Sequence, residues 1–308
     1  MNYFLIDAFN LAYRAHNVNY ELRTIEGLSS GMFYGFLRTI FSLKKKYRGY
    51  KFIVVWDNHA DHKFDLNPEY KSGRTPLPQT VTQQISDIKK YLQHCGIDQY
   101  EKKGQEADDV IASLVEMFKG EGNTVIVYSN DKDFLQLVET GRVIVYKPKV
   151  GLSPEKFYDE EAVIEKFGVS PSKLACFRSF AGDSSDALNG VPRVPRKIIA
   201  GLVNEHEEIE RVYDSLEEVK LTDFQRKMLM EHRGSVETNF KIIKLDRYLE
   251  GLEKTEGAYE EETLKSLLKK YEVKSINPAM MIDLFSSSLN IKYTDPRDNI
   301  KLESYSLF

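Results

Sequence analysis

The sequence predicts an α/β protein with a mostly parallel sheet and flanking helices, followed by a helical region. In the first half, short apolar runs rich in Val, Ile and Tyr alternate with longer stretches of helical periodicity, which is typical of parallel strands joined by helices. From SPEKFYDEEAVIEKFG (153–168) onward, helical patterns and Gly, Pro, Asp and Ser turns dominate. Strand patterns are almost absent there, which indicates a second, all-helical region from about residue 165 to the end.

Four apolar runs have the length and continuity of strands buried on both faces. They are YFLID (3–7), KFIVVWD (51–57), TVIVYSND (124–131) and RVIVYK (142–147). Helices are predicted between them at 30–47, 81–96 and 107–122. The last of these helices ends at the stop signal of Gly120 and Gly122.

The composition is that of an ordinary soluble globular protein. Hydrophobic residues make up 42% of the 308 residues and charged residues 29%. No apolar run approaches the roughly 20 residues that a membrane span needs. Cys95 and Cys176 lack metal-ligand spacing, which predicts reduced thiols and a cytoplasmic location. A net charge of −4 disfavours nucleic acid as a partner, but an acidic site can hide a basic face elsewhere.

Acidic residues follow three of the four apolar runs. The first run ends at Asp7, the second at Asp57 and the third at Asp131, with Asp133 two residues later. The carboxyl ends of parallel strands meet at one edge of a sheet, where ligands bind in open α/β folds. Any single one of these residues is more simply a turn residue at a strand end. Together, they predict an acidic edge.

The stretch GQEADDVIASLV (104–115) adds the carboxylates of Glu106, Asp108 and Asp109 at the start of a helix. This helix leads into the strand that ends at Asp131, so its N-terminus belongs at the same edge. Acids there gain about 0.3–1 kcal/mol each from the helix dipole. Carboxylates gathered so closely also repel one another unless cations bind. Oxygen ligands without His or Cys select Mg²⁺ or Mn²⁺ over zinc.

A second acidic group lies in GDSSDALNG (182–190), where Asp183 and Asp186 occupy a turn between helical segments. A helix N-cap and an Asx turn explain them equally well. If the helical region packs against the acidic edge, these residues complete a second cation site. Two Mg²⁺ ions about 3.5–4 Å apart are a common arrangement for phosphodiester cleavage.

Basic and aromatic residues cluster in two loops. They are Tyr70, Lys71 and Arg74 in NPEYKSGRTPLP (67–78), and Arg193, Arg196 and Lys197 in GVPRVPRK (190–197). The first loop can stack a base and hold phosphate, although an ordinary solvated loop has the same composition. The second loop precedes a helix whose free N–H groups would add to the attraction for phosphate.

Six motifs together resemble the 5′ nuclease (flap endonuclease) family. They are LIDAFNLAYRA, VVWD, EYKSGRTP, EADDVIASL, SNDKDFLQLV and GDSSDALNGVP, in family order over about residues 3–200. The third, fourth and sixth motifs are the most specific. The family comprises phage 5′ exonucleases, the 5′-nuclease domain of bacterial DNA polymerase I and, more distantly, eukaryotic and archaeal flap endonucleases.

The resemblance implies a PIN-like α/β nuclease domain over 1–165, with a helical arch at about 70–95. A helical DNA-binding region over 166–308 would follow, with a helix–three-turn–helix (helix-hairpin-helix) at about 170–205. It further implies a monomeric enzyme of the bacterial or phage-infected cytoplasm, a 5′-3′ exonuclease and flap endonuclease that uses two divalent ions, Mg²⁺ or Mn²⁺. Its partners would be DNA with 5′ flaps, 5′ overhangs or RNA primers, in replication or repair.

Carried over by motif, the resemblance gives each candidate residue a role. The first ion is assigned Asp7, Asp57, Glu106, Asp108 and Asp109, and the second Asp131, Asp133, Asp183 and Asp186. Lys71 would stabilise charge at the scissile phosphate, with Arg74 beside it. Tyr70, at the base of the arch, would stack on an unpaired nucleotide, and Arg14 would lie near substrate phosphate.

One motif departs from the family pattern. After GVP, family members carry Gly, a hydrophobic residue and Gly, then one residue and Lys, whereas this chain has Arg193, Val194 and Pro195. Glycine permits positive φ and close backbone approach to phosphate, while proline fixes φ and removes an N–H. The change argues against the backbone phosphate and K⁺ site of the family. Arg193 or Arg196 would hold duplex DNA by side-chain charge instead.

Three further interpretations stay open. The ending SYSLF (304–308) resembles the peptide that binds the bacterial sliding clamp, but an apolar end tucked onto the protein explains it more simply. A PIN-type ribonuclease would share the acidic edge, while the loop at 67–78 and the helical region would be surplus to it. A non-catalytic module that binds branched DNA would not need an intact set of acids.

Overall fold

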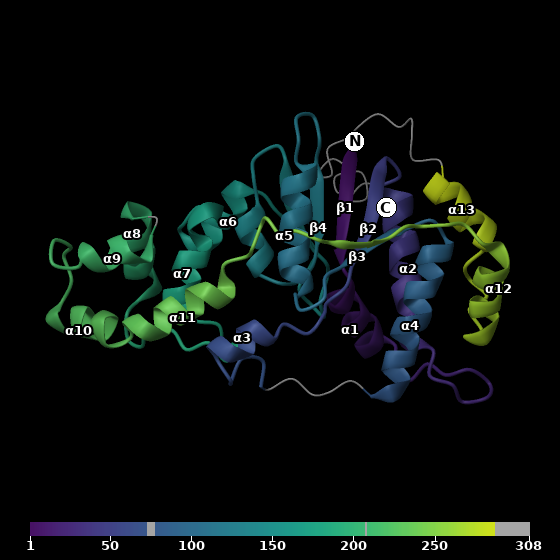
Figure 1. Cartoon of the computed structure of the whole chain (residues 1–308), viewed down its shortest axis with the longest axis horizontal. Coiled ribbons are helices and arrows are strands. Elements are labelled where there is room, and N and C mark those ends of the chain that lie inside the picture. The colour runs from purple at the N-terminus through teal and green to yellow at the C-terminus, as the bar shows by residue number, and fades with distance from the viewer. Residues whose placement is uncertain (73–77, 207, 287–308) are drawn as a thin grey trace.

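The computed structural model of the chain describes residues 1–72, 78–206 and 208–286 (Figure 1). In this part of the chain a seven-stranded sheet has the order β6-β5-β4-β1-β2-β3-β7. Its strands are β1 (Asn2–Asp7), β2 (Tyr50–Val55), β3 (Asp98–Glu101), β4 (Val125–Tyr128), β5 (Val143–Lys147), β6 (Lys156–Tyr158) and β7 (Glu253–Thr255). The pairs among β1 to β5 are parallel, and β6 and β7 join the two edges antiparallel. The predicted mostly parallel sheet is confirmed.

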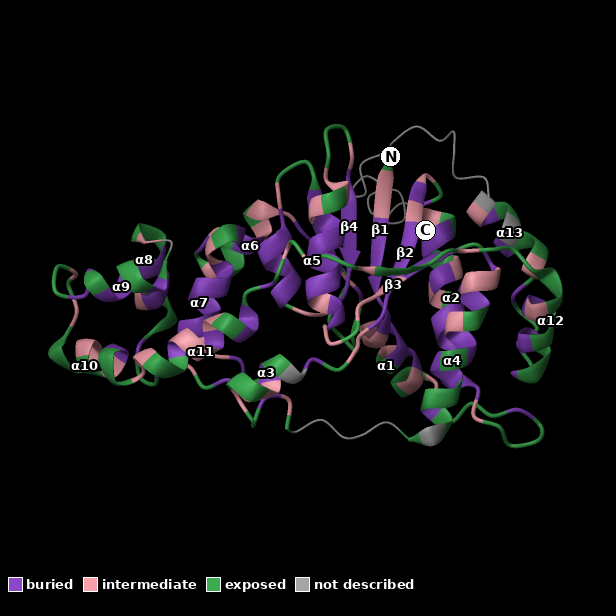
Figure 2. Ribbon diagram, in the orientation of Figure 1, coloured by how far each residue is buried: buried purple, intermediate pink, exposed green. Residues whose placement is uncertain are grey.

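Helices cover both faces of the sheet. Those of the first half are α1 (Ala8–Val18), α2 (Gly31–Lys46), α3 (Asp61–Leu66), α4 (Gln79–His94) and α5 (Ala107–Phe118). Alternate residues of β1 point to opposite faces: Phe4 packs in one core with Phe36 of α2, and Leu5 packs in the other with Ile111 of α5. Figure 2 shows the strands mostly buried between these layers. The continuous apolar runs of the sequence arise from this double burial.

The later half of the chain forms short helices beside the sheet (Figure 1). These are α6 (Glu160–Phe167), α7 (Leu174–Ala181), α8 (Arg196–Glu205), α9 (Ile209–Asp214), α10 (Asp223–Glu231), α11 (Arg233–Ile243), α12 (Glu261–Lys270) and α13 (Pro278–Ser286). The described residues also form short 3-10 helices: η1 (Asp133–Leu137) between β4 and β5, and η2 (Pro171–Lys173) and η3 (Ser184–Asp186) on either side of α7. The segment expected to form a helix–three-turn–helix, 170–205, contains α7 and α8 joined through η3.

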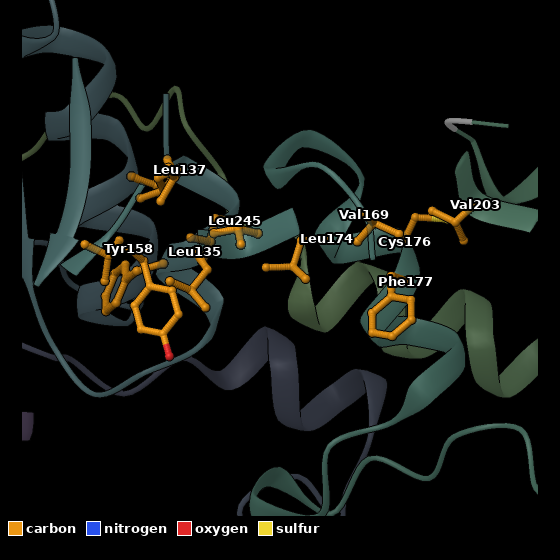
Figure 3. Packing of buried hydrophobic residues seen from close by; sticks show 14 of the residues in the cluster. Leu135, Leu137, Tyr158, Val169, Leu174, Cys176, Phe177, Val203 and Leu245 are labelled. Atoms are coloured by element: carbon orange, nitrogen blue, oxygen red, sulfur yellow. The ribbon is translucent and has the colours of Figure 1, made fainter. Parts of the chain in front are cut away.

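The helical region and the sheet share one hydrophobic core. Figure 3 shows the shared packing, from Leu137 and Tyr158 near the sheet, through Leu174 and Phe177 of α7, to Val203 of α8. The helices therefore pack directly against the α/β layers. No helix among the described residues is long and apolar enough to cross a membrane.

The prediction of an all-helical second region from about residue 165 is wrong at β7, which adds to the edge of β3. β6 lies before that boundary, although the stretch 153–168 that contains it has a helical pattern. All three residues of β7 are exposed and polar or charged, because an edge strand pairs through its backbone. Such a strand carries no apolar pattern. β3 was also missed, since its four residues, DQYE, are mixed in polarity.

The chain returns to the first half at its end. α12 packs against α4, where Asp87 accepts hydrogen bonds from Lys270 Nζ at 2.5 Å and from the Tyr271 hydroxyl at 2.6 Å. The Tyr271 ring stacks on Phe33 of α2, with ring centroids 4.2 Å apart. The last described segment is thus fastened to the α/β layers. The ending SYSLF (304–308) lies outside the described residues.

Candidate metal centre and nucleic-acid interface

The predicted acidic edge is built from strand ends and from the start of α5. Asp7 ends β1 and accepts hydrogen bonds from the Asn10 N–H at 3.0 Å and the Ser129 hydroxyl at 2.8 Å. Asp57 follows β2 and accepts from the Ala107 N–H at 2.8 Å, which ties β2 to the first residue of α5. Parallel register therefore brings carboxylates from distant parts of the sequence to one edge.

Electrostatics show how closely these carboxylates lie. Burial, with repulsion from Asp57 and Asp131, raises the pKa of Asp7 to about 7. Desolvation and the charge of Asp131 hold the pKa of Asp108 well above its usual range. Buried carboxylates that repel one another are ionised together only beside a cation, and their oxygens fit a hard divalent ion. As the side chains stand, no three Asp, Glu, His or Cys groups in the described ranges enclose an ion.

Glu106 belongs to the edge, but its oxygens already have partners. Its Oε2 accepts from Lys63 Nζ at 3.0 Å and from the Tyr70 hydroxyl at 3.0 Å, and its Oε1 accepts from Lys71 Nζ at 2.5 Å. Burial opposes the ionised form, yet the charges of Lys63 and Lys71 lower the pKa of Glu106 to about 2. Glu106 is thus an ionised anchor for Lys63, Tyr70 and Lys71.

Asp109 shares the Lys63 ammonium with Glu106. Its Oδ2 lies 3.0 Å from Lys63 Nζ, and its Oδ1 accepts from the Asp246 N–H at 2.9 Å. The Lys63 ammonium already neutralises this carboxylate, so the structure does not support the prediction that Asp109 is a metal ligand. Lys63, on α3, was missed because a lone lysine in a short polar helix gives no signal in the sequence. Its side chain is 4% exposed and lies between the Glu106 and Asp109 carboxylates.

The expected stacking role of Tyr70 does not match the structure. Its ring is 4% exposed and packs edge-on against Phe64, with centroids 5.6 Å apart. The bond from its hydroxyl to Glu106 draws the ring inward, so Tyr70 presents no open face to a base. Lys71 has a positive φ of 54° and places its ammonium 4.8 Å from the Tyr70 ring centroid. Arg74 lies outside the described residues.

The second acidic group lies beside Asp133, with Arg178 between Asp183 and Asp133. Asp133 begins η1, and its N–H donates to Asp131 Oδ1 at 2.8 Å. Asp183 precedes η3, and its Oδ1 accepts from the Ser185 N–H at 2.9 Å. Asp186 is buried close enough to Tyr70 for its charge to raise the pKa of that hydroxyl, after the larger effects of burial and Glu106.

Arg178, which the sequence analysis missed, lies between Asp133 and Asp183. It extends from α7, forms an ion pair with Asp133 through one guanidinium nitrogen and hydrogen-bonds Asp183 through the other. Burial raises the pKa of Asp183, but hydrogen bonds from Ser185 and the charge of Arg178 lower it overall. A single arginine in the apolar helix LACFRSFA was the available signal, because buried charges need partners.

The candidate DNA contacts are basic residues at two places. Arg14 of α1 bonds the hydroxyl of Tyr128, the last residue of β4, and lies 5.3 Å from its ring centroid. Arg193, Arg196 and Lys197 are all exposed, before and at the start of α8. Arg193 has a φ of 59°, so an arginine here adopts the left-handed conformation that glycine favours.

Comparison with known proteins places these features in context. The sequence model described as "5′-3′ exonuclease, N-terminal resolvase-like domain" matches residues 2–168. A 5′-3′ exonuclease of Aquifex aeolicus is 32% identical over 283 residues, which cover 87% of this chain and 94% of that protein. DNA polymerase I of Bacillus subtilis is 31% identical over 234 residues, covering 73% of this chain and 26% of the polymerase. This chain thus spans nearly all of the exonuclease and about a quarter of the polymerase.

The fold also matches a solved structure. The bacteriophage T5 flap endonuclease, in complex with DNA and metal ions, superimposes with a TM-score of 0.63 at 18% identity, covering 93% of this chain and all of that chain. Likeness at this identity shows that the two chains share the fold.

Proposed function

Because the chain belongs to the 5′-3′ exonuclease family, we propose that it is a structure-specific 5′ nuclease that hydrolyses DNA phosphodiesters near 5′ ends. The observation that carries the proposal is the acidic edge itself. Asp7, Asp57, Asp108 and Asp131 are near enough to change one another's protonation, and the Lys71 ammonium lies beside them. Such an arrangement suits binding and cleavage of a phosphodiester.

These four aspartates are the proposed ligands of a divalent ion, Mg²⁺ or Mn²⁺. When bound, such an ion supplies a polarised water and a counter-charge for phosphate oxygens. Asp133, Asp183 and Asp186 complete the acidic rim on the side of the helical region. Asp109 is left out of the set because its charge is already paired with the Lys63 ammonium.

Lys71 is the proposed group that stabilises negative charge on the scissile phosphate. Its ammonium is held by Glu106, and its charge also reaches Asp108, where it favours the ionised carboxylate. Lys63 and Tyr70 fix Glu106 from the other side, so they position Lys71 indirectly. Arg74 is proposed to assist from the neighbouring loop.

DNA is the proposed partner, with 5′ flaps, 5′ overhangs or RNA primers. Arg193, Arg196 and Lys197 are exposed at the α8 end of the helical region and are proposed to contact duplex phosphates, with Arg14 nearer the acidic edge. Phosphate contacts of this kind fix the orientation of a duplex without reading its sequence. The monomeric state, the cytoplasmic location and the clamp-binding peptide stay predictions.

The test is Mg²⁺-dependent cleavage of a 5′-labelled flap duplex. We expect wild type to release junction products, Asp131→Ala to release none, and Lys71→Ala to be slower by about 10²–10³-fold, as when one stabilising donor is lost. Lys119→Ala is the matched control, because Lys119 pairs with Glu116 and Glu139 away from the acidic edge. Cleavage of an RNA substrate alone would favour the ribonuclease, and tight binding without cleavage would favour the binding module.

A further inference from the structure

We propose that the guanidinium of Arg178 takes the place of a second divalent ion, so that this chain binds one such ion firmly and another only when Arg178 is displaced. The inference deepens the proposed nuclease function and rests on it. The inference depends on Arg178, which belongs to none of the six motifs because it precedes the GDSSDALNG stretch (182–190).

Arg178 lies directly between two carboxylates that the family resemblance assigns to an ion. One guanidinium nitrogen pairs with Asp133 Oδ1 and the other with Asp183 Oδ2. The arginine side chain is 5% exposed, and the two aspartates are buried as well. A planar, permanently charged guanidinium fits two carboxylates at once, so Arg178 neutralises both without an ion.

The frame around this pair is rigid. Leu174, Cys176 and Phe177 of α7 are packed in the shared core, as Figure 3 shows. Gly182 links α7 to the Asp183 turn with a φ of 72°, and a Cβ placed there would lie 2.3 Å from the backbone nitrogen of Gly190. The packing of α7 and the close fit at Gly182 hold the backbone on both sides of this pair, so under the proposal an arriving ion displaces the Arg178 side chain.

The two acidic groups therefore face different charges. In the first group, Asp7 accepts from the neutral Ser129 hydroxyl and Asp57 from the neutral Ala107 N–H. Asp183 of the second group, together with the neighbouring Asp133, faces the guanidinium of Arg178. An ion entering the second group must break two buried ion pairs first, which lowers its apparent affinity. An ion entering the first group relieves the repulsion between the carboxylates, which raises the apparent affinity of that ion.

The test is Mn²⁺ binding to the full-length, DNA-free protein, followed by calorimetry and by the paramagnetic resonance of free Mn²⁺. We expect wild type to bind one ion tightly. Arg178→Met should strengthen binding of a second ion by at least about ten-fold, within the range by which neighbouring groups tune metal sites. Arg178→Lys keeps a charge near both carboxylates and should keep the single tight ion. Damage to the fold would weaken binding, so a gain of affinity is specific to the proposal.

Arg247→Met is the matched control. Arg247 donates to the Gln136 carbonyl on the same 3-10 helix, η1, and pairs with Glu116, so it contacts the same element without touching the acidic rim. Its loss should leave Mn²⁺ binding unchanged. If Arg178→Met does not fold, Asp183→Asn replaces it: under the proposal this change leaves the tight ion unaffected.

Two tight ions in wild type, or an unchanged second affinity in folded Arg178→Met, would overturn the inference. Loss of the tight ion in Asp183→Asn would overturn it too. These outcomes are separate from failure of the nuclease proposal. Flap cleavage with two tight ions retains the nuclease and removes the role of Arg178, whereas absence of both cleavage and Mn²⁺ binding removes the nuclease itself.

Discussion

Replacing Lys63 by Met should destabilise the protein by about 3–5 kcal/mol at pH 7, the range for breaking a buried ion pair. The Lys63 ammonium lies 3.0 Å from both Glu106 and Asp109, and its side chain is 4% exposed, so water cannot take its place. The pKa of Glu106 gives a second value for this free energy, since it falls from 4.5 to about 2 despite burial. That shift corresponds to roughly 3 kcal/mol, which is shared between Lys63 and Lys71.

The pH dependence gives the sharper result. A carboxylate whose pKa is lowered by folding stabilises the protein above its unfolded pKa, and this contribution is lost as pH falls through its folded pKa. For Glu106 the loss runs from 4.5 down to about 2 in wild type. In Lys63→Met the pKa of Glu106 should be higher, since only Lys71 remains to lower it. Protonation then relieves the unpaired charge, and the stability difference from wild type should shrink as pH falls from 7 to 4.

Urea unfolding in EDTA at pH 7, 5 and 4 measures this difference. Lys119→Met is the control, because its ion pairs are more exposed and should contribute less than about 1 kcal/mol. Lys63→Arg should recover much of the loss by keeping the charge. An equal difference at all three pH values would refute the electrostatic reasoning, because it would show that Lys63 acts through packing alone.

Three further changes have expected outcomes. Tyr70→Phe removes a hydrogen bond to ionised Glu106 and should lower stability by about 1.5–3 kcal/mol in urea unfolding, with slower flap cleavage and unchanged Mn²⁺ affinity; equal stability would contradict the bond. Arg193→Gly should stabilise the protein by about 1 kcal/mol, by relieving positive φ, and should weaken duplex binding in a salt titration; unaltered binding would exclude Arg193 as a DNA contact. In EDTA, the stability of wild type should fall as pH rises from 4 to about 7, because folded Asp7 keeps its proton there, and Asp7→Asn should reduce that fall, leaving the part that Asp108 contributes; the same slope in both proteins would contradict the raised pKa.

The sheet and its acidic edge were predictable because their signals are local. Each of the runs at 3–7, 51–57 and 124–131 shows its burial and its terminal aspartate within a few residues. Parallel pairing then places those ends together without knowledge of any side-chain contact. The strand at 253–255 was not predictable in this way, because edge pairing uses the backbone and leaves no periodic pattern. The strand at 98–101 was not predictable because its four residues are mixed in polarity.

The cations at the site were harder to foresee. Lys63 contacts Glu106, which lies 43 residues away in the sequence, and nothing near Lys63 indicates that partner. Arg178 had a usable signal, a charge within an apolar helix, but only the tertiary structure shows that the charge faces two aspartates. The buried ring of Tyr70 likewise depends on the partner of its hydroxyl.

The return of the chain to its first half has a consequence for biosynthesis. Among the described residues, 253–255 cover the outer edge of β3, and Asp87 gains two of its hydrogen bonds from Lys270 and Tyr271. A ribosome must therefore translate nearly the whole chain before the sheet is complete. Until then an open strand edge, the usual starting point of aggregation, stays accessible on the nascent protein. Fragments that stop near residue 168 or 250 would keep that edge permanently.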